Sequence, residues 1–393
     1  MRRAAWSDRA LWFVMAIAIS SGDFASLRAQ APASAAIVQV RLSPAHEHYR
    51  RRIENAANES LARFSEWLGP LPSATIVIAD RRDAVDPAAI AVDLPWRSAP
   101  STMDVESLVS YGVAKKWWTQ LAEERNDRPV VNGVAWYLQS RLVERLYDFA
   151  FFNPGHSSDA VRFFGGAVPW QFPVLRMTRW TSGLGRFEYL RSDARGMWPA
   201  AARRLPADLD PEAIRIALAF ASLERSAGWP AAQGALFEWA RQGRVLALSD
   251  AIGQDVSGLF EAARDQTRIV DYAVGTFSSA PCPTGGCLIT RVTTEGVGNP
   301  IAARDLELRV DFADGQQVEA RWNGDATLKQ FEFESPAAPA GAHLDPDRTV
   351  LLDGNWLNND RLVTPRTNVP IRKWVARWVV WLQDASLTYA SLL

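Results

Sequence analysis

The stretch that decides the interpretation of this chain is Tyr111-Gly112-Val113-Ala114-Lys115-Lys116-Trp117-Trp118. It lies in an amphipathic run, 106–120, whose spacing predicts a helix. Tyr111 and Lys115 are one helical turn apart, so they share one face of that helix. A phenol with a pKa of about 10 and an ammonium group with a pKa of about 10.4 offer a poor neutral ligand and a cation at neutral pH. No ordinary zinc site can form on this face, because zinc binds neutral imidazole, thiolate or carboxylate groups.

Two later stretches accompany this helix. The next predicted helix, 131–151, begins with Val131-Asn132-Gly133-Val134-Ala135-Trp136-Tyr137. Asn132 offers an amide oxygen, which is a weak, neutral substitute for a carboxylate ligand. A third helix is predicted over 211–225, and Ala213 in its first turn has no polar group.

In their order along the chain, these stretches resemble three motifs of the membrane-alanyl-aminopeptidase family of gluzincin metallopeptidases, H-E-x-x-H-x-W-[FW], N-E-G-x-A-x-Y and Y-x-K-x-A-x-x-L-x-x-L-E-x-x-x-G. The resemblance covers roughly residues 40–365. It places Tyr111, Lys115 and Asn132 at the three zinc-ligand positions. Gly112 stands where the family has the glutamate that activates the zinc-bound water, and Ala213 where it has the tyrosine that stabilises the oxyanion. The resemblance therefore implies a degenerate, zinc-free family member with no cofactor.

The flanking sequence both supports and limits this resemblance. Residues 61–72 and 76–78 look like the helix, G-x-x-P turn and strand that open such catalytic domains. The family's exopeptidase signature, G-x-M-E-N, is absent from 91–104.

The resemblance and the residue patterns predict an α+β protein: a thermolysin-like, mostly helical domain over 40–265, a small antiparallel β-sandwich over 266–365 and a C-terminal helix over 366–393. Helical spacing before a β-branched run predicts a helix and then a strand within 45–80. Further helices are predicted over 231–242 and 253–264. Alternation of period two predicts strands at 306–312 and 317–322, joined by a turn at Asp314-Gly315, and the set continues at 331–333 and 350–353.

The first 31 residues resemble a signal peptide. Three arginines precede the apolar run 11–19, and a small-residue site follows at Ala29-Gln30-Ala31. An uncleaved N-terminal anchor is the alternative, because Pro32 directly after that site disfavours cleavage. We expect an exported protein, periplasmic or extracellular.

The chain has two cysteines, Cys282 and Cys287, on either side of Pro283-Thr284-Gly285-Gly286. In an oxidising compartment this spacing favours a local disulfide that closes a turn, with a free pair as the alternative.

The charge pattern gives no reason to expect a nucleic-acid partner. The net charge is -1, with 43 basic and 44 acidic side chains. In the tail, Trp374, Trp378 and Trp381 form one stripe of the predicted helix. We expect this stripe to dock on the body of the protein, with peripheral membrane contact as the alternative.

Other candidate sites are weaker. His46 and His48 would lie on one side of a strand, but three neighbouring arginines oppose a cation. His156 and His343 stand alone, Thr181-Ser182-Gly183 has no nearby His, and an acidic cluster fits a solvated loop. That cluster consists of Glu123, Glu124 and Asp127. Lys115 would pair with a carboxylate or point to solvent, and the candidate partners are Glu106, Glu123 and Glu144.

These observations lead to one expected function and one alternative. We expect a catalytically inactive, exported aminopeptidase-like protein that binds a peptide or a protein partner through a β-edge. The alternative is a hydrolase of the metallopeptidase family with non-standard or unrecognised active-site chemistry.

Overall fold

The computed structural model describes residues 37–69, 75–80, 88–94, 104–122, 127–147, 209–242, 256–265, 267–283, 285–298, 301, 306–324 and 326–364. The predicted signal peptide (1–31) and C-terminal helix (366–393) lie outside these residues, as do Glu123, Glu124, His156, Thr181-Ser182-Gly183 and the side chain of Glu144. Within the described ranges, no helix is long and apolar enough to cross a bilayer.

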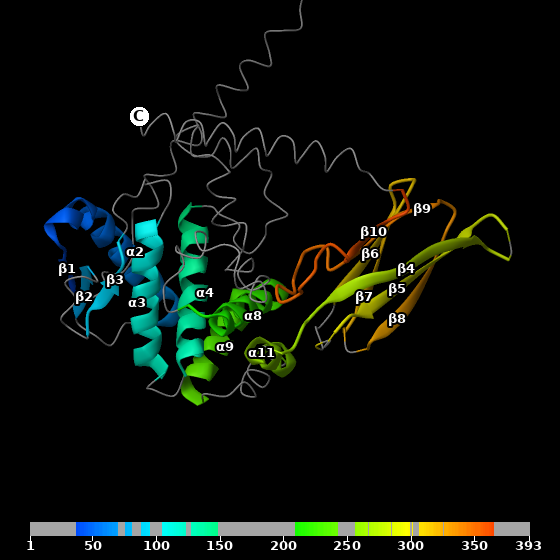
Figure 1. Ribbon diagram of the computed structural model, residues 1–393. Coiled ribbons are helices and arrows are strands. Elements are labelled where there is room, and N and C mark those ends of the chain that lie inside the picture. Colours follow the sequence, from blue (N-terminus) through cyan, green and yellow to red (C-terminus); the bar gives the residue numbers. More distant parts are fainter. Residues whose placement is uncertain are drawn as a thin grey trace, which may run out of the picture.

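The fold begins with a small parallel sheet (Figure 1). Strand β1 (Ile37–Arg41) leads through the 3-10 helix η2 (Pro44–Tyr49) into helix α2 (Arg50–Leu68). Gly69, with a φ of 83°, follows the last residue of α2. Strands β2 (Thr75–Asp80) and β3 (Ile90–Val92) complete the sheet in the order β1-β2-β3. The predicted helix and strand in this region are confirmed, whereas β1 and β3 were not predicted.

One sequence expectation here is wrong. His46 and His48 lie on η2 and not on a strand. Pro44 stands in the first turn of η2, where the fixed φ of proline favours helical geometry and its missing N–H is not needed. The two histidines therefore differ in environment: His46 is buried and His48 is exposed.

Five helices form the centre of the molecule. They are α3 (Asp104–Ala122), α4 (Arg128–Tyr147), α8 (Pro211–Ala227), α9 (Trp229–Gln242) and α11 (Ser257–Arg264). Helix α3 packs between α2 and α4, and α4 packs on α8, which also contacts α9 and α11. All five helices were predicted, although α11 begins at Ser257 and not at Gly253.

Helix α8 illustrates why the sequence forms these elements. Asp210 caps its first turn, because its carboxylate accepts a hydrogen bond from the N–H of Ala213 at 2.7 Å. Gly228, with a φ of 82°, follows its last residue. Between these ends the helix is buried without interruption from Ala213 to Leu223, because it contacts α4, α9 and α11.

The strands that follow the helices form two small antiparallel sheets. The first has the order β4-β5-β8 and the second β10-β9-β6-β7, and contacts between β4 and β9 join them. The strands are β4 (Tyr272–Pro281), β5 (Leu288–Gly296), β6 (Leu306–Phe312), β7 (Gln317–Trp322), β8 (Leu328–Ser335), β9 (Pro339–Leu344) and β10 (Asp360–Leu362). The predicted turn between β6 and β7 is confirmed, with Gly315 at a φ of 86°. The combination of helices and antiparallel sheets confirms the α+β class.

The predicted strand at 350–353 is wrong. This segment is a turn, with one isolated bridge between Val270 and Asp353. Two of its backbone donors bind side chains and not a neighbouring strand. The N–H of Val350 donates to Asp345 at 2.9 Å, and that of Leu351 donates to Ser222 on α8 at 2.9 Å.

Polar contacts from α8 join the helices to the sheets. The buried guanidinium of Arg215 donates to backbone oxygens of Ala263, Asp265 and Arg268 at 2.9–3.1 Å, where α11 ends and the chain enters the sheets. A cation at the C-terminus of a helix also complements the helix dipole. The guanidinium of Arg225 donates to the backbone oxygen of Arg348.

Candidate functional site

The helix pair α3 and α4 carries four of the five positions singled out by the sequence resemblance: Tyr111, Gly112, Lys115 and Asn132. The fifth, Ala213, lies on α8, which packs against α4. Tyr111 is 5% exposed, and its ring meets that of Trp136 edge to face, with the centroids 6.2 Å apart. An edge-to-face aromatic pair is a favourable packing arrangement, so Tyr111 acts as a core residue that joins the two helices.

Glycine at position 112 makes room for a side chain of the neighbouring strand β3. A Cβ atom at this position would overlap Cγ2 of Ile90, and Cβ of Ile90 lies 3.6 Å from the same point. Ile90 is buried and begins β3, which packs on α3. The space beside the backbone of Gly112 is therefore filled by an isoleucine side chain and leaves no room for a carboxylate.

Asn132 and Ala213 lie at a close crossing of α4 and α8. Asn132 is fully buried. A Cβ on the next residue, Gly133, would lie 2.6 Å from the backbone oxygen of Ala213 and 2.8 Å from Cβ of Ile216. Glycine at 133 thus allows the two helix backbones to approach, and Ala213 contributes backbone contact and no functional group.

The two lysines of α3, Lys115 and Lys116, are both partly exposed. Lys115 is half-buried, and its backbone oxygen accepts a hydrogen bond from Thr119 at 2.8 Å. Lys116 donates through Nζ to the backbone oxygen of Ala88 at 3.0 Å. Glu106, one of the partners considered for Lys115, pairs with Arg52 of α2 through two hydrogen bonds of 2.9 and 2.7 Å. Among the described residues, no group of three or more His, Cys, Asp or Glu side chains could hold a metal ion.

A buried ion pair that was not predicted from the sequence joins α4 to α8. Arg141 of α4 is 2% exposed and donates to Glu224 of α8 at 2.9 Å, and the hydroxyl of Tyr137 donates to the same carboxylate at 2.6 Å. The guanidinium also lies 4.3 Å from the ring centroid of Trp67 and 3.6 Å from that of Trp229, within cation–π range of both. The available signal was a lone arginine in the apolar part of a predicted helix. Such a pair is structural, because each charge is matched and packed.

A second missed cluster lies at the carboxyl end of β2. His46 and Asp80 are both buried, and Nδ1 of His46 lies 2.5 Å from Oδ2 of Asp80. Ser43 donates to the same oxygen at 2.8 Å, and its hydroxyl is 3.5 Å from Nδ1. In a catalytic triad the serine would meet Nε2, on the opposite side of the ring. Ser43 and His46 both bind Asp80 directly, so this arrangement ties η2 to β2 and does not form a nucleophile.

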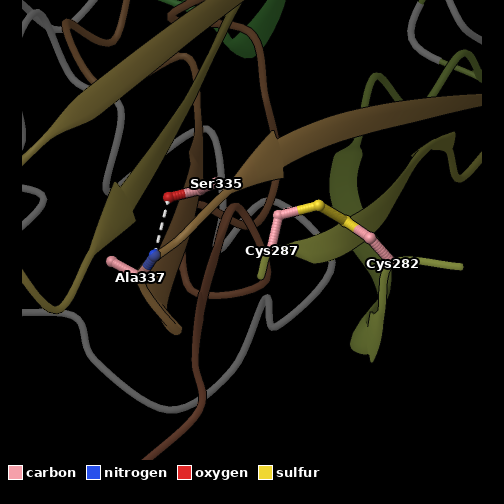
Figure 2. The surroundings of a disulfide bond; sticks show 4 residues. All are labelled: Cys282, Cys287, Ser335 and Ala337. Carbon is pink, nitrogen blue, oxygen red and sulfur yellow. Dashed lines mark hydrogen bonds between the residues drawn. A yellow bond between two sulfur atoms is a disulfide. The ribbon is translucent and has the colours of Figure 1, made fainter. Parts of the chain in front are cut away.

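The two cysteines form the disulfide predicted from their spacing (Figure 2). Their Cα atoms are 5.3 Å apart, and the bond closes the turn between β4 and β5. Gly285 and Gly286 take φ values of 73° and 78°, which side chains rarely adopt. Figure 2 also shows the end of β8 near this turn, where the hydroxyl of Ser335 accepts a hydrogen bond from the N–H of Ala337 at 3.1 Å.

Comparison with known proteins gives a distant structural similarity. No protein-family model matches the chain, and no curated protein matches it in sequence. Among solved structures, the chain is similar to aminopeptidase A of Legionella pneumophila, crystallised in complex with aspartic acid, with a TM-score of 0.46 and 12% identity. The similarity covers 80% of this chain and 36% of that chain, so this chain spans about a third of its length. The gluzincin resemblance therefore stays a prediction from the sequence.

Proposed function

We propose that this protein has a gluzincin-type, thermolysin-like helical core without hydrolytic activity, and that it acts by binding a peptide or protein partner. The observation that carries this proposal is the contact between Gly112 and Ile90. At the position that the sequence resemblance assigns to the general base, the protein has an apolar contact between a helix and a strand.

The other assigned positions support the same conclusion. Tyr111 is packed against Trp136, and Asn132 is buried at the crossing of α4 and α8. Lys115 would bring a positive charge to a cation site. Restoring a zinc site would require replacing core residues, which distinguishes this arrangement from an empty site with its ligands in place.

The proposed binding surface is the edge of the parallel sheet. In the strand order of that sheet, β3 is terminal, and Ala91 in its middle is exposed. An extended peptide could add to such an edge through backbone hydrogen bonds.

Metal content and hydrolysis test the proposal. Purified protein should hold far less than about one zinc per chain after dialysis, because its candidate ligands are a phenol, an ammonium group and an amide. Hydrolysis of aminoacyl-anilide substrates should stay at background with or without added zinc. Tyr111→Phe serves as the matched control, since it keeps the aromatic packing and removes the phenol oxygen from the candidate ligands. An activity that a chelator abolishes and that Tyr111→Phe reduces would overturn the proposal.

Partner binding needs a separate measurement. Hydrogen exchange of the β3 amides should slow when a mixture of short extended peptides is added, while exchange in β6 stays unchanged. If exchange at β3 does not slow, binding of an extended peptide at this edge is wrong.

A further inference from the structure

A charged cluster crosses three strands of the four-stranded sheet. His343 on β9 lies between Asp360 on β10 and Asp311 on β6. Its Nδ1 is 2.6 Å from Oδ1 of Asp360, and its Nε2 is 3.3 Å from Oδ2 of Asp311. The histidine is half-buried, with 19% of its side chain exposed.

The two carboxylates at opposite nitrogens of the ring favour the protonated form of His343. A neutral imidazole carries one N–H, so one of its two nitrogens would direct a lone pair at a carboxylate. An imidazolium donates from both nitrogens and satisfies both aspartates. The two carboxylates lie at opposite nitrogens of one ring, so they do not converge on a point where a metal ion could bind both of them and His343.

Each of the two carboxylates also has an arginine nearby. Arg309 of β6 lies 3.9 Å from Asp311, and Arg348 lies 3.8 Å from Asp360. Hydrogen bonding to Asp360 is the main cause that raises the pKa of His343, and the charges of Asp360 and Asp311 act in the same direction. Partial burial and Arg309 oppose this increase.

Strand β10 is short and exposed, and mainly polar contacts hold it. It is three residues long, lies at the sheet edge, and all of its side chains are exposed. It pairs with β9 from Asp360 opposite His343 to Leu362 opposite Gly341. Arg361 adds a hydrogen bond to the backbone oxygen of Gly275 on β4. Since β10 buries little apolar surface, its ion pair with His343 is one of the few side-chain contacts that fix it to β9.

We propose that protonated His343 is a pH-sensitive latch that holds strand β10 on β9 and β6, and that deprotonation loosens this edge strand. Through Arg348, whose backbone oxygen binds Arg225 of α8, the same cluster is connected to the helices. The latch is independent of the proposed partner binding at β3.

The direction of the pH effect follows from the raised pKa. Below the unfolded-state value of about 6.5, His343 is protonated in both states and its stabilisation is fully present. As pH rises through the higher folded-state value, the latched state loses its proton and that stabilisation disappears. A pKa difference of one unit between the latched and released states would change the opening equilibrium by about tenfold.

The test follows His343 and β10 in the full-length protein across pH. The ring signals of His343, assigned by their loss in His343→Gln, should titrate above pH ~6.5. Asp360→Asn and Asp311→Asn should each lower that pKa. The amides of Arg361 and Val363, which face β9, should become roughly three- to tenfold less protected, after correction for intrinsic exchange, as His343 deprotonates. His48→Gln, which removes an exposed histidine on η2, is the matched control and should change neither readout.

Two outcomes would overturn the latch. One is a pKa of His343 at or below the ordinary value. The other is protection of β10 that has the same pH dependence in the native protein and in His343→Gln. If His343→Gln fails to fold, Asp360→Asn provides the comparison, because it removes the carboxylate of β10 that His343 binds.

Discussion

At the scale of single residues, Gly112 joins the sequence motif to the packing of the core. We predict that Gly112→Ala destabilises the protein by about 1–3 kcal/mol, because the new methyl group would overlap Ile90. Gly234 of α9 is the control, since a Cβ there would meet nothing within 4 Å. Gly234→Ala should stabilise by about 0.5–1 kcal/mol through helix propensity. Denaturant unfolding of both variants measures the difference, and equal effects at the two glycines would show that Ile90 does not occupy this space.

At the scale of elements, the turn between β4 and β5 depends on one covalent bond. Mass spectrometry of unreduced peptides should find Cys282 linked to Cys287 in the exported fraction. Replacing both with serine should lower the free energy of unfolding by about 2 kcal/mol, since the closed loop is short. Reduced native protein should match this variant in a thermal melt. Free thiols in the oxidised protein would contradict the bond and weaken the case for export.

The elements also show what sequence can predict. The five central helices follow from repeated apolar spacing, and β6 and β7 follow from alternation around Asp314-Gly315. Strands β3 and β10 are three residues long, which is too short for a periodic signal. The segment 350–353 resembled a strand because it is apolar, but the N–H of Val350 binds the nearby Asp345 and that of Leu351 binds Ser222, which is distant in the sequence. The same holds for the candidate site: residue types predicted that zinc ligands are absent, and only the tertiary packing shows that Ile90 fills the space beside Gly112.

At the scale of the whole molecule, the contacts between helices and sheets predict a single unfolding transition. Ser222 of α8 is buried and accepts a hydrogen bond from the N–H of Leu351. Ser222→Ala leaves that N–H without its partner and should lower stability by about 1–3 kcal/mol. Ser226→Ala, one turn along the same helix at an exposed serine, should change stability by less than about 0.5 kcal/mol. Calorimetry should show one transition in both variants; two separated transitions would mean that helices and sheets unfold independently.

The contact between Gly112 and Ile90 also restricts which mutational paths are open to this protein. A zinc site would require Tyr111→His, Gly112→Glu, Lys115→His and Asn132→Glu, and the second of these overlaps Ile90. A smaller residue at position 90 would have to come first, and by itself it would leave a cavity in the core. The two changes are thus epistatic in sign: each is harmful alone and tolerable only with the other. Selection for stability that acts on one substitution at a time would therefore keep the protein away from a metal site.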